Sequence, residues 1–94
     1  MTTINITVNR INLGGIGFVT DAELPCKDRE ECTLNLKAND TIDVDVKIIV
    51  IQSDKDDSGY THRAMYRHLT DEQIASLQEL MLVNIDDICG TFVV

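Results

Sequence analysis

Apolar and polar residues alternate strictly at two places in the chain, which is the pattern of a β-strand with one buried face. Near the start, Ile4, Ile6 and Val8 share one face, and polar residues occupy the other. A longer run begins at Ile42, where apolar residues take every second position before the pattern becomes wholly apolar near Val50. The alternation therefore predicts a strand at each place, and the second should be the longest in the chain.

Shorter apolar segments predict further strands. They cover Gly15 to about Ala22, Cys32 to Lys37, and Tyr60 to Leu69. The end of the chain, Gly90 to Val94, contains a strongly β-prone tetrad, so we expect it to pair or pack against the other strands.

One helix is predicted late in the chain. Thr70-Asp71-Glu72-Gln73 has the order of a capping box, in which the Thr70 hydroxyl accepts from the amide of Gln73 and acidic residues stand at the positive helix end. Apolar residues then recur at helical spacing, at Ile74, Leu77, Leu80 and Met81. The helix should therefore begin after Thr70 and lay one apolar face on the sheet.

Glycine, proline and charge mark the connections between these elements. Gly14, Gly15 and Gly17 fall within four residues, which indicates a bulge, a tight bend or a close approach to the backbone. Residues 24–31 hold the single proline and five charges, and residues 53–59 are almost entirely polar. Both segments are predicted to be surface connections.

The composition favours one small domain, residues 1–94, of the mainly β (α+β) class. Apolar residues make up 44% of the chain and aromatic residues only 4%, so the core should consist of Ile, Val and Leu. Sixteen acidic residues against eight basic ones give a net charge of −8. This charge repels the phosphate backbone of nucleic acids, so we do not expect direct binding of DNA or RNA.

The sequence also predicts where the protein resides. No apolar run approaches the length of about 20 residues that spans a bilayer, and the first residues lack the basic-then-apolar order of a signal peptide. Cys26, Cys32 and Cys89 form an odd set without a CxxC pair. We therefore expect a cytoplasmic protein without membrane insertion, whose cysteines are reduced and mostly structural.

The order of these segments resembles the PilZ family, over about Ile4 to Met81. The best-matched pieces are Leu13–Phe18 (LGGIGF), Glu23–Pro25, Ala64–Tyr66 and Leu69–Glu72. The resemblance implies a six-stranded antiparallel β-barrel closed by a short helix, and a link to the bacterial second messenger cyclic di-GMP.

Recognition of cyclic di-GMP requires arginine. Two guanines and two phosphates are best held by guanidinium groups that pair bidentately or stack. Family members that bind this ligand typically supply them from an RxxxR segment upstream of a (D/N)xSxxG motif. Only nine residues precede Arg10 and none of them is basic, so that segment, together with the strand after it, is missing from this chain.

The second motif is altered as well. The register that keeps the double glycine places Arg10 at the Asp/Asn position, Asn12 at the Ser position and Gly15 at the last Gly. The other register keeps Asn9 and Gly14 but puts Ile11 where the hydroxyl belongs.

The candidate binding residues are therefore Arg10, Asn12, Gly14 and Gly15, to which Arg63 or Arg67 on a neighbouring strand would add a second guanidinium. The structural alternative for the same segment is a strained glycine turn with Asn12 capping its own backbone. The loss of a strand would leave an open barrel edge, which the terminal segment or a partner chain would cover.

Metal binding is not expected. Asp54–Gly59 copies the opening of a calcium loop, but Met65 occupies position twelve, which requires a bidentate Glu. His62 and His68 would lie roughly 20 Å apart on one strand, too far to share a metal ion. We expect both histidines to be at the surface or half-buried.

Catalysis is not expected either. Cys26 and Cys32 flank Asp28, Glu30 and Glu31, whose charges disfavour a thiolate nucleophile. No P-loop, serine elbow or HExxH motif is present.

The leading hypothesis is a PilZ-like adaptor that acts through a protein partner in cyclic di-GMP-linked control of bacterial motility, pili or surface behaviour. The first alternative is a receptor that binds cyclic di-GMP, its only expected ligand, through Arg10 and the Gly14–Gly15 turn. The second is an acidic inhibitor that mimics nucleic acid. No cofactor is expected, and the sequence is compatible with a homo-oligomer.

Overall fold

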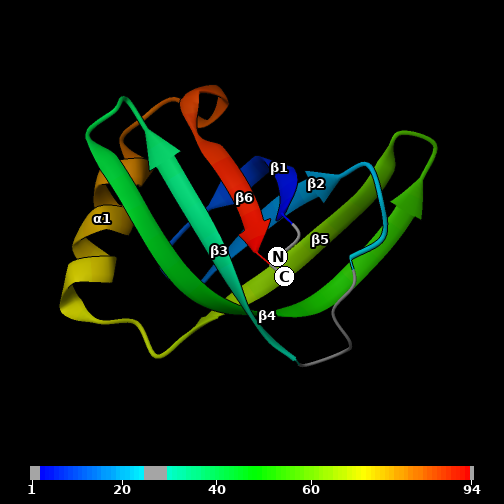
Figure 1. The fold of residues 1–94 in the computed structure, drawn as a ribbon, viewed down its shortest axis with the longest axis horizontal. Coiled ribbons are helices and arrows are strands. Elements are labelled where there is room, and N and C mark those ends of the chain that lie inside the picture. The colour runs from blue at the N-terminus through cyan, green and yellow to red at the C-terminus, as the bar shows by residue number, and fades with distance from the viewer. Residues whose placement is uncertain (1–2, 25–29, 94) are drawn as a thin grey trace.

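The computed structural model, which describes residues 3–24 and 30–93, contains six strands, one α-helix and a short 3-10 helix (Figure 1). The strands are β1 (Thr3–Ile11), β2 (Gly15–Thr20), β3 (Glu31–Ala38), β4 (Ile42–Asp56), β5 (Gly59–Arg67) and β6 (Cys89–Val93). The helices are α1 (Asp71–Met81) and η1 (Ile85–Asp87). Each predicted strand and the predicted helix are thus confirmed, with small shifts at their ends.

The strands form a closed antiparallel barrel in the order β1-β2-β5-β4-β3-β6, so the mainly β prediction is confirmed. Strand β6 completes it by pairing with two strands at once, since Phe92 lies opposite Ile4 of β1 and opposite Leu34 of β3. The terminal segment therefore covers the edge that was expected to be open, and the six strands close the barrel. Because the barrel is closed, its described strands include no first or last strand with a free edge along the barrel wall.

The inside and outside of the barrel follow the alternation in the sequence. In β4, Ile42, Val44, Val46 and Ile48 are buried, whereas the residues between them are exposed. Phe18 and Phe92 are almost completely buried and supply most of the aromatic mass of the core. This core of Ile, Val and Leu with few aromatic residues is the one that the composition predicts.

Strand β4 is longer than the polar composition of residues 53–59 predicts. It continues to Asp56, and the turn itself consists of Asp57 and Ser58. The polar residues remain in the strand because they pair with β5, for example Lys55 with Tyr60. The β4–β5 hairpin therefore projects beyond the barrel as an exposed arm, on the right in Figure 1.

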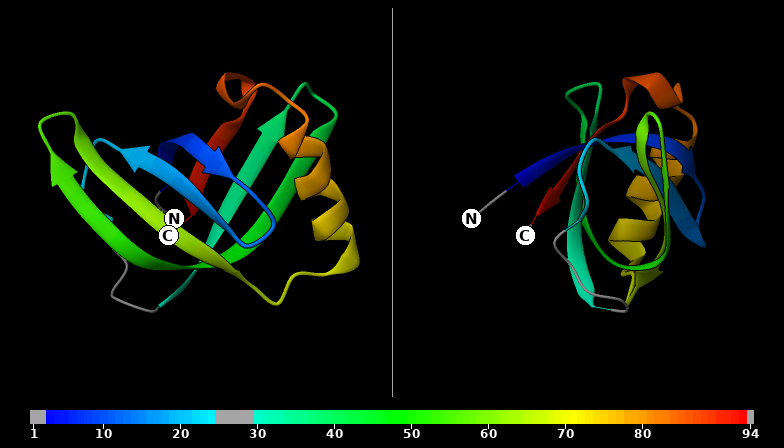
Figure 2. Two further views of the ribbon diagram at one scale, coloured as in Figure 1. Left: turned by 180° about the vertical axis from the view of Figure 1, so that it is seen from behind. Right: turned by 90° about the vertical axis from the view of Figure 1, so that its right-hand side faces the viewer.

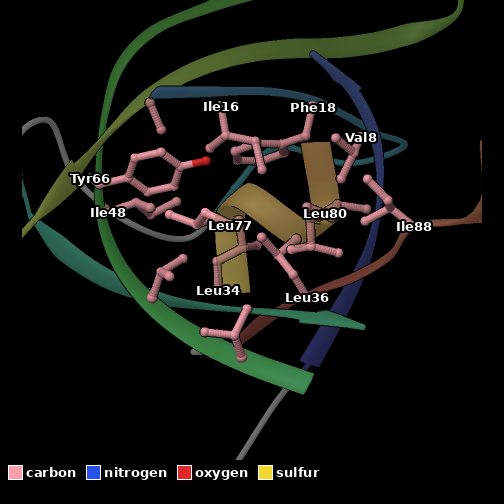
Figure 3. Packing of buried hydrophobic residues seen from close by; sticks show 14 of the residues in the cluster. Val8, Ile16, Phe18, Leu34, Leu36, Ile48, Tyr66, Leu77, Leu80 and Ile88 are labelled. Carbon is pink, nitrogen blue, oxygen red and sulfur yellow. The ribbon is translucent and has the colours of Figure 1, made fainter. Parts of the chain in front are cut away.

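Helix α1 begins as the capping box predicts. Thr70 Oγ1 accepts from the Gln73 amide at 3.1 Å, and Gln73 Oε1 accepts from the Thr70 amide at 2.8 Å. The Gln73 side chain also donates to the backbone oxygen of Asp45 at 2.8 Å, which ties the helix to β4. Leu77 and Leu80 are fully buried and point into the space enclosed by the strands (Figure 3).

The described residues include no helix with the length and apolar character needed to cross a bilayer.

Tyr66 brings a hydroxyl group into this core. Its ring extends inward from β5 (Figure 3), and no described residue offers its Oη a hydrogen bond. Burial raises the pKa of Tyr66 well above its usual value, so the hydroxyl stays protonated. A buried polar group without a partner costs free energy, so this hydroxyl does not stabilise the fold.

We expect Tyr66→Phe to leave the free energy of unfolding unchanged or to raise it by about 1 kcal/mol, because only the unsatisfied hydroxyl is removed. Urea denaturation followed by circular dichroism measures this change. Leu77→Ala, in the same core, should lower the value by about 2–5 kcal/mol and serves as the comparison. A clear loss of stability in Tyr66→Phe would contradict the view that the hydroxyl is unsatisfied.

Candidate functional site

Two bulges shift the alternation on neighbouring parts of the barrel wall. In β1, Val8 pairs with Phe18 and Arg10 with Gly17, so Asn9 is an extra residue. Ile6 and Val8 face inward, and regular alternation would bury Arg10 as well. The extra residue instead turns Arg10 to the outside, where it is exposed.

The second bulge lies in β4. Val50 pairs with Ala64 and Gln52 with Arg63, so Ile51 is the extra residue. Without it, Gln52 would face the core in the series that ends with Val50. Gln52 faces outward beside Arg63, and Ile51 is left 57% exposed.

Both bulges lie next to one row of residues that are paired across neighbouring strands. A shallow hollow of about 250 Å³ lies over this row. In this row, Arg10 and Arg63 stand on either side of Gly17, each paired with it. We call this depression the Arg10–Arg63 hollow; its lining includes Asn9, Arg10, Asn12, Gly14, Gly15, Gly17, Ile51, Arg63 and Met65. Figure 2 (left) shows β2 and β5 crossing this wall side by side.

The hollow combines positive charge with apolar surface. Among the described residues, Arg10 and Arg63 are the charged ones that line it, and no described carboxylate lies within 4.0 Å of either guanidinium. Ile51 and Met65 add exposed apolar side chains at 57% and 43% exposure. In a chain of net charge −8, this is a local positive site with apolar neighbours.

The structure thus brings together five of the six candidate residues, Arg10, Asn12, Gly14, Gly15 and Arg63. Arg67 lies further along β5, opposite Lys47, and does not line the hollow. Its Nε atom is buried and has no hydrogen-bond partner among the described residues. The sequence did not predict Ile51 and Met65 as part of the site. The β4 bulge exposes Ile51, and a bulge within an apolar run leaves no signal in the sequence.

The Asn12–Gly15 segment forms the turn between β1 and β2. Asn12 Oδ1 accepts from the amides of Gly14 and Gly15, both at 2.9 Å, so the predicted capping of its own backbone is confirmed. The predicted strained turn is wrong, since neither glycine has a left-handed φ. Gly15 is needed for a different reason: a Cβ atom there would lie 2.6 Å from the backbone oxygen of Ala64.

His62 ties three strands together beneath the hollow. It is 1% exposed, which corrects the prediction of a surface or half-buried histidine. Because Ile51 is an extra residue, Ser53 is paired with His62 and lies on the same side of the sheet. Ser53 is exposed, and its Oγ lies 2.7 Å from His62 Nδ1. On the other side, Thr20 Oγ1 lies 2.9 Å from His62 Nε2.

The hydrogen bonds of Thr20 fix the tautomer of this histidine. Thr20 Oγ1 donates to the backbone oxygen of Ala22 at 2.7 Å, so it accepts from Nε2–H of His62. Nδ1 then carries the lone pair and accepts from Ser53 Oγ. Burial lowers the pKa of His62, which keeps this ring neutral.

Other predicted features lie away from the hollow. The calcium-like segment forms the tip of the arm, where Asp56 Oδ1 accepts from the Ser58 hydroxyl and amide, and these bonds lower the pKa of Asp56. Within residues 3–24 and 30–93, no group of three or more His, Cys, Asp or Glu side chains is placed to hold a metal ion. Cys32 Sγ donates to the backbone oxygen of Glu30 at 3.4 Å, Cys89 is exposed, and Cys26 lies outside the described residues.

We expect Gly15→Ala to lower the free energy of unfolding by about 1–3 kcal/mol, because the new Cβ would press on the backbone of β5. Gly14→Ala is the matched control: its Cβ would lie 3.4 Å from Asn12 Oδ1, an ordinary contact, so the change should stay within about 0.5 kcal/mol. Urea denaturation of both variants provides the test. Equal effects at the two positions would rule out close approach as the reason for Gly15.

The buried histidine makes stability depend on pH. The unfolded chain, where the pKa is near 6.5, takes up a proton at His62 more readily than the folded chain. The free energy of unfolding should therefore fall as the pH drops through 6.5 and level off below the folded-state pKa. Denaturation curves between about pH 7.5 and 5 should show this fall in the wild type and in His68→Gln, and His62→Gln should lack it. An unchanged pH dependence in His62→Gln would contradict this assignment.

Comparison of the chain with protein-family models, with curated proteins and with solved structures finds no match. The resemblance to the PilZ family therefore remains a prediction from the residue pattern.

Proposed function

We propose that the chain is a PilZ-like adaptor in cyclic di-GMP-linked bacterial signalling, and that it binds a protein partner through the outer wall around the Arg10–Arg63 hollow. The observation that carries this proposal is the composition of the hollow. Arg10 and Arg63, neither of which pairs with a described carboxylate, stand beside exposed Ile51 and Met65. Arginine and methionine are enriched where proteins bind each other, and exposed apolar groups next to a polar rim are typical of such surfaces.

The size and charge of the hollow favour an adaptor over a strong receptor of cyclic di-GMP. The ligand presents two guanines and two phosphates, whereas the hollow offers two guanidinium groups. Its volume of about 250 Å³ is also below the range of about 300–1,000 Å³ that is usual for small-molecule sites. The hollow can therefore hold part of the ligand at most.

A receptor is the second candidate, and one observation favours it. Arg10 and Arg63 come from strands that are not neighbours in sequence, yet both line the hollow together with Asn12, Gly14 and Gly15. Two guanidinium groups in this position suit one guanine edge or one phosphate.

Titration calorimetry with cyclic di-GMP separates the two candidates. The adaptor predicts no measurable heat of binding at ligand concentrations up to about 100 μM, because one half-site provides too little affinity. Micromolar binding that disappears in both Arg10→Ala and Arg63→Ala, but not in Lys37→Ala, would establish the receptor instead. Lys37 is a fair control because it is exposed on β3, away from the hollow.

Site-specific photo-cross-linking in the native host tests the adaptor directly. A photoreactive residue in place of Met65 should capture one identifiable protein, and the adduct should be lost when Arg10→Glu and Arg63→Glu are added. The same residue in place of Lys37 should not capture it. Capture that is equal from both positions, or that survives the two charge reversals, would refute an interface at the hollow.

A further inference from the structure

The two arginines of the hollow differ from Lys37 on β3 and Lys47 on β4 in their electrostatic partners. Lys37 lies 3.9 Å from Asp43, and Lys47 lies 3.6 Å from Glu31. Arg10 and Arg63 have no such carboxylate among the described residues. The positive charge of the hollow is thus available to a partner.

Neighbouring acidic residues do not neutralise this charge. Asp54 is two positions along β4 from Gln52, the residue opposite Arg63, but its carboxylate accepts from Gln52 Nε2 at 2.9 Å. Asp54 is thus held by an amide and makes no ion pair with Arg63.

The apolar residues of the hollow lie on one side of the arginine pair. Met65 is two positions from Arg63 along β5, so the two side chains share the outer face about 7 Å apart. Ile51 is the bulged residue beside Gln52, on the far side of β5 from Gly17. A bound segment would therefore meet charge over β1 and β5, and apolar surface over β5 and β4.

We infer that the partner presents an extended acidic segment to the Arg10–Arg63 hollow, with two carboxylates for the arginines and an adjacent apolar side chain for Ile51 and Met65. This inference rests on the proposed adaptor function and specifies the chemistry of its partner. The two arginines stand two strand spacings apart, about 10 Å between their Cα atoms. Carboxylates two residues apart in an extended chain are separated by about 7 Å, which the long arginine side chains can bridge.

The overall charge restricts the partner to a short acidic segment. At −8, the molecule repels a long polyanion such as nucleic acid, and this repulsion acts over about 8 Å at physiological salt. Two carboxylates that contact the guanidinium groups directly gain more than they lose to this field, because they pair at short range.

The glycine amides provide a built-in test by nuclear magnetic resonance. Gly14, Gly15 and Gly17 line the hollow, whereas Gly59 is in the arm and Gly90 is in β6. The probe is the peptide acetyl-Gly-Glu-Ser-Glu-Leu-Leu-Gly-amide, titrated into the full ¹⁵N-labelled chain. We expect the amide signals of the first three glycines to shift with the peptide, and those of the other two to stay in place.

Variants and a control peptide establish which groups are recognised. A peptide with Gln in place of both Glu should cause no shift, and Arg63→Gln or Arg10→Gln should weaken binding about fivefold. Lys37→Gln should change it less than twofold. The signal dispersion in the same spectra shows that each variant is folded.

Three results would overturn the inference. The first is that the glycine signals stay in place with the acidic peptide, and the second is that the Gln peptide shifts them equally. The third is that they shift with protein concentration alone, which would assign the hollow to a second copy of this chain. If any of these occurs while the Met65 cross-link still depends on the two arginines, the adaptor function stands and only the acidic partner is wrong. If the cross-link fails as well, both are wrong.

Discussion

In a closed barrel every strand residue faces either the core or the solvent, and this constraint governs both the fold and the candidate site. Alternation along a strand assigns the two faces, so only an extra residue can change the assignment. Asn9 and Ile51 are such residues, and both flank the row that contains Gly17. The outward position of Arg10 and the pairing of Ser53 with His62 follow from these two bulges.

The same bulge in β4 links the surface of the wall to its interior. It exposes Ile51 on the outside, and it turns the exposed Ser53 toward the buried His62, to which Ser53 donates. His62 is also bonded to Thr20, so strands β2, β5 and β4 are joined by side chains as well as by backbone hydrogen bonds. The hollow therefore lies on a part of the wall whose strands are joined by side-chain hydrogen bonds.

Net charge describes this protein poorly at the scale of a binding site. The chain carries −8, yet the hollow is lined by two arginines and by no carboxylate. Long-range fields decide which large partners approach, and short-range pairing decides which groups bind. The long-range field of the net charge disfavours nucleic acid. Short-range pairing with the two arginines favours an anionic group of limited size at the hollow.

The sequence by itself determined the elements, because their signals are local. Alternation marked the strand from Ile42, and the Thr70 capping box marked the start of the helix, since both depend on residues that are neighbours along the backbone. Only the tertiary structure decided that Arg10 and Arg63 share a hollow and that His62 is buried. These outcomes depend on the pairing of strands far apart in sequence, where an extra residue in one strand reverses which side chains face the core.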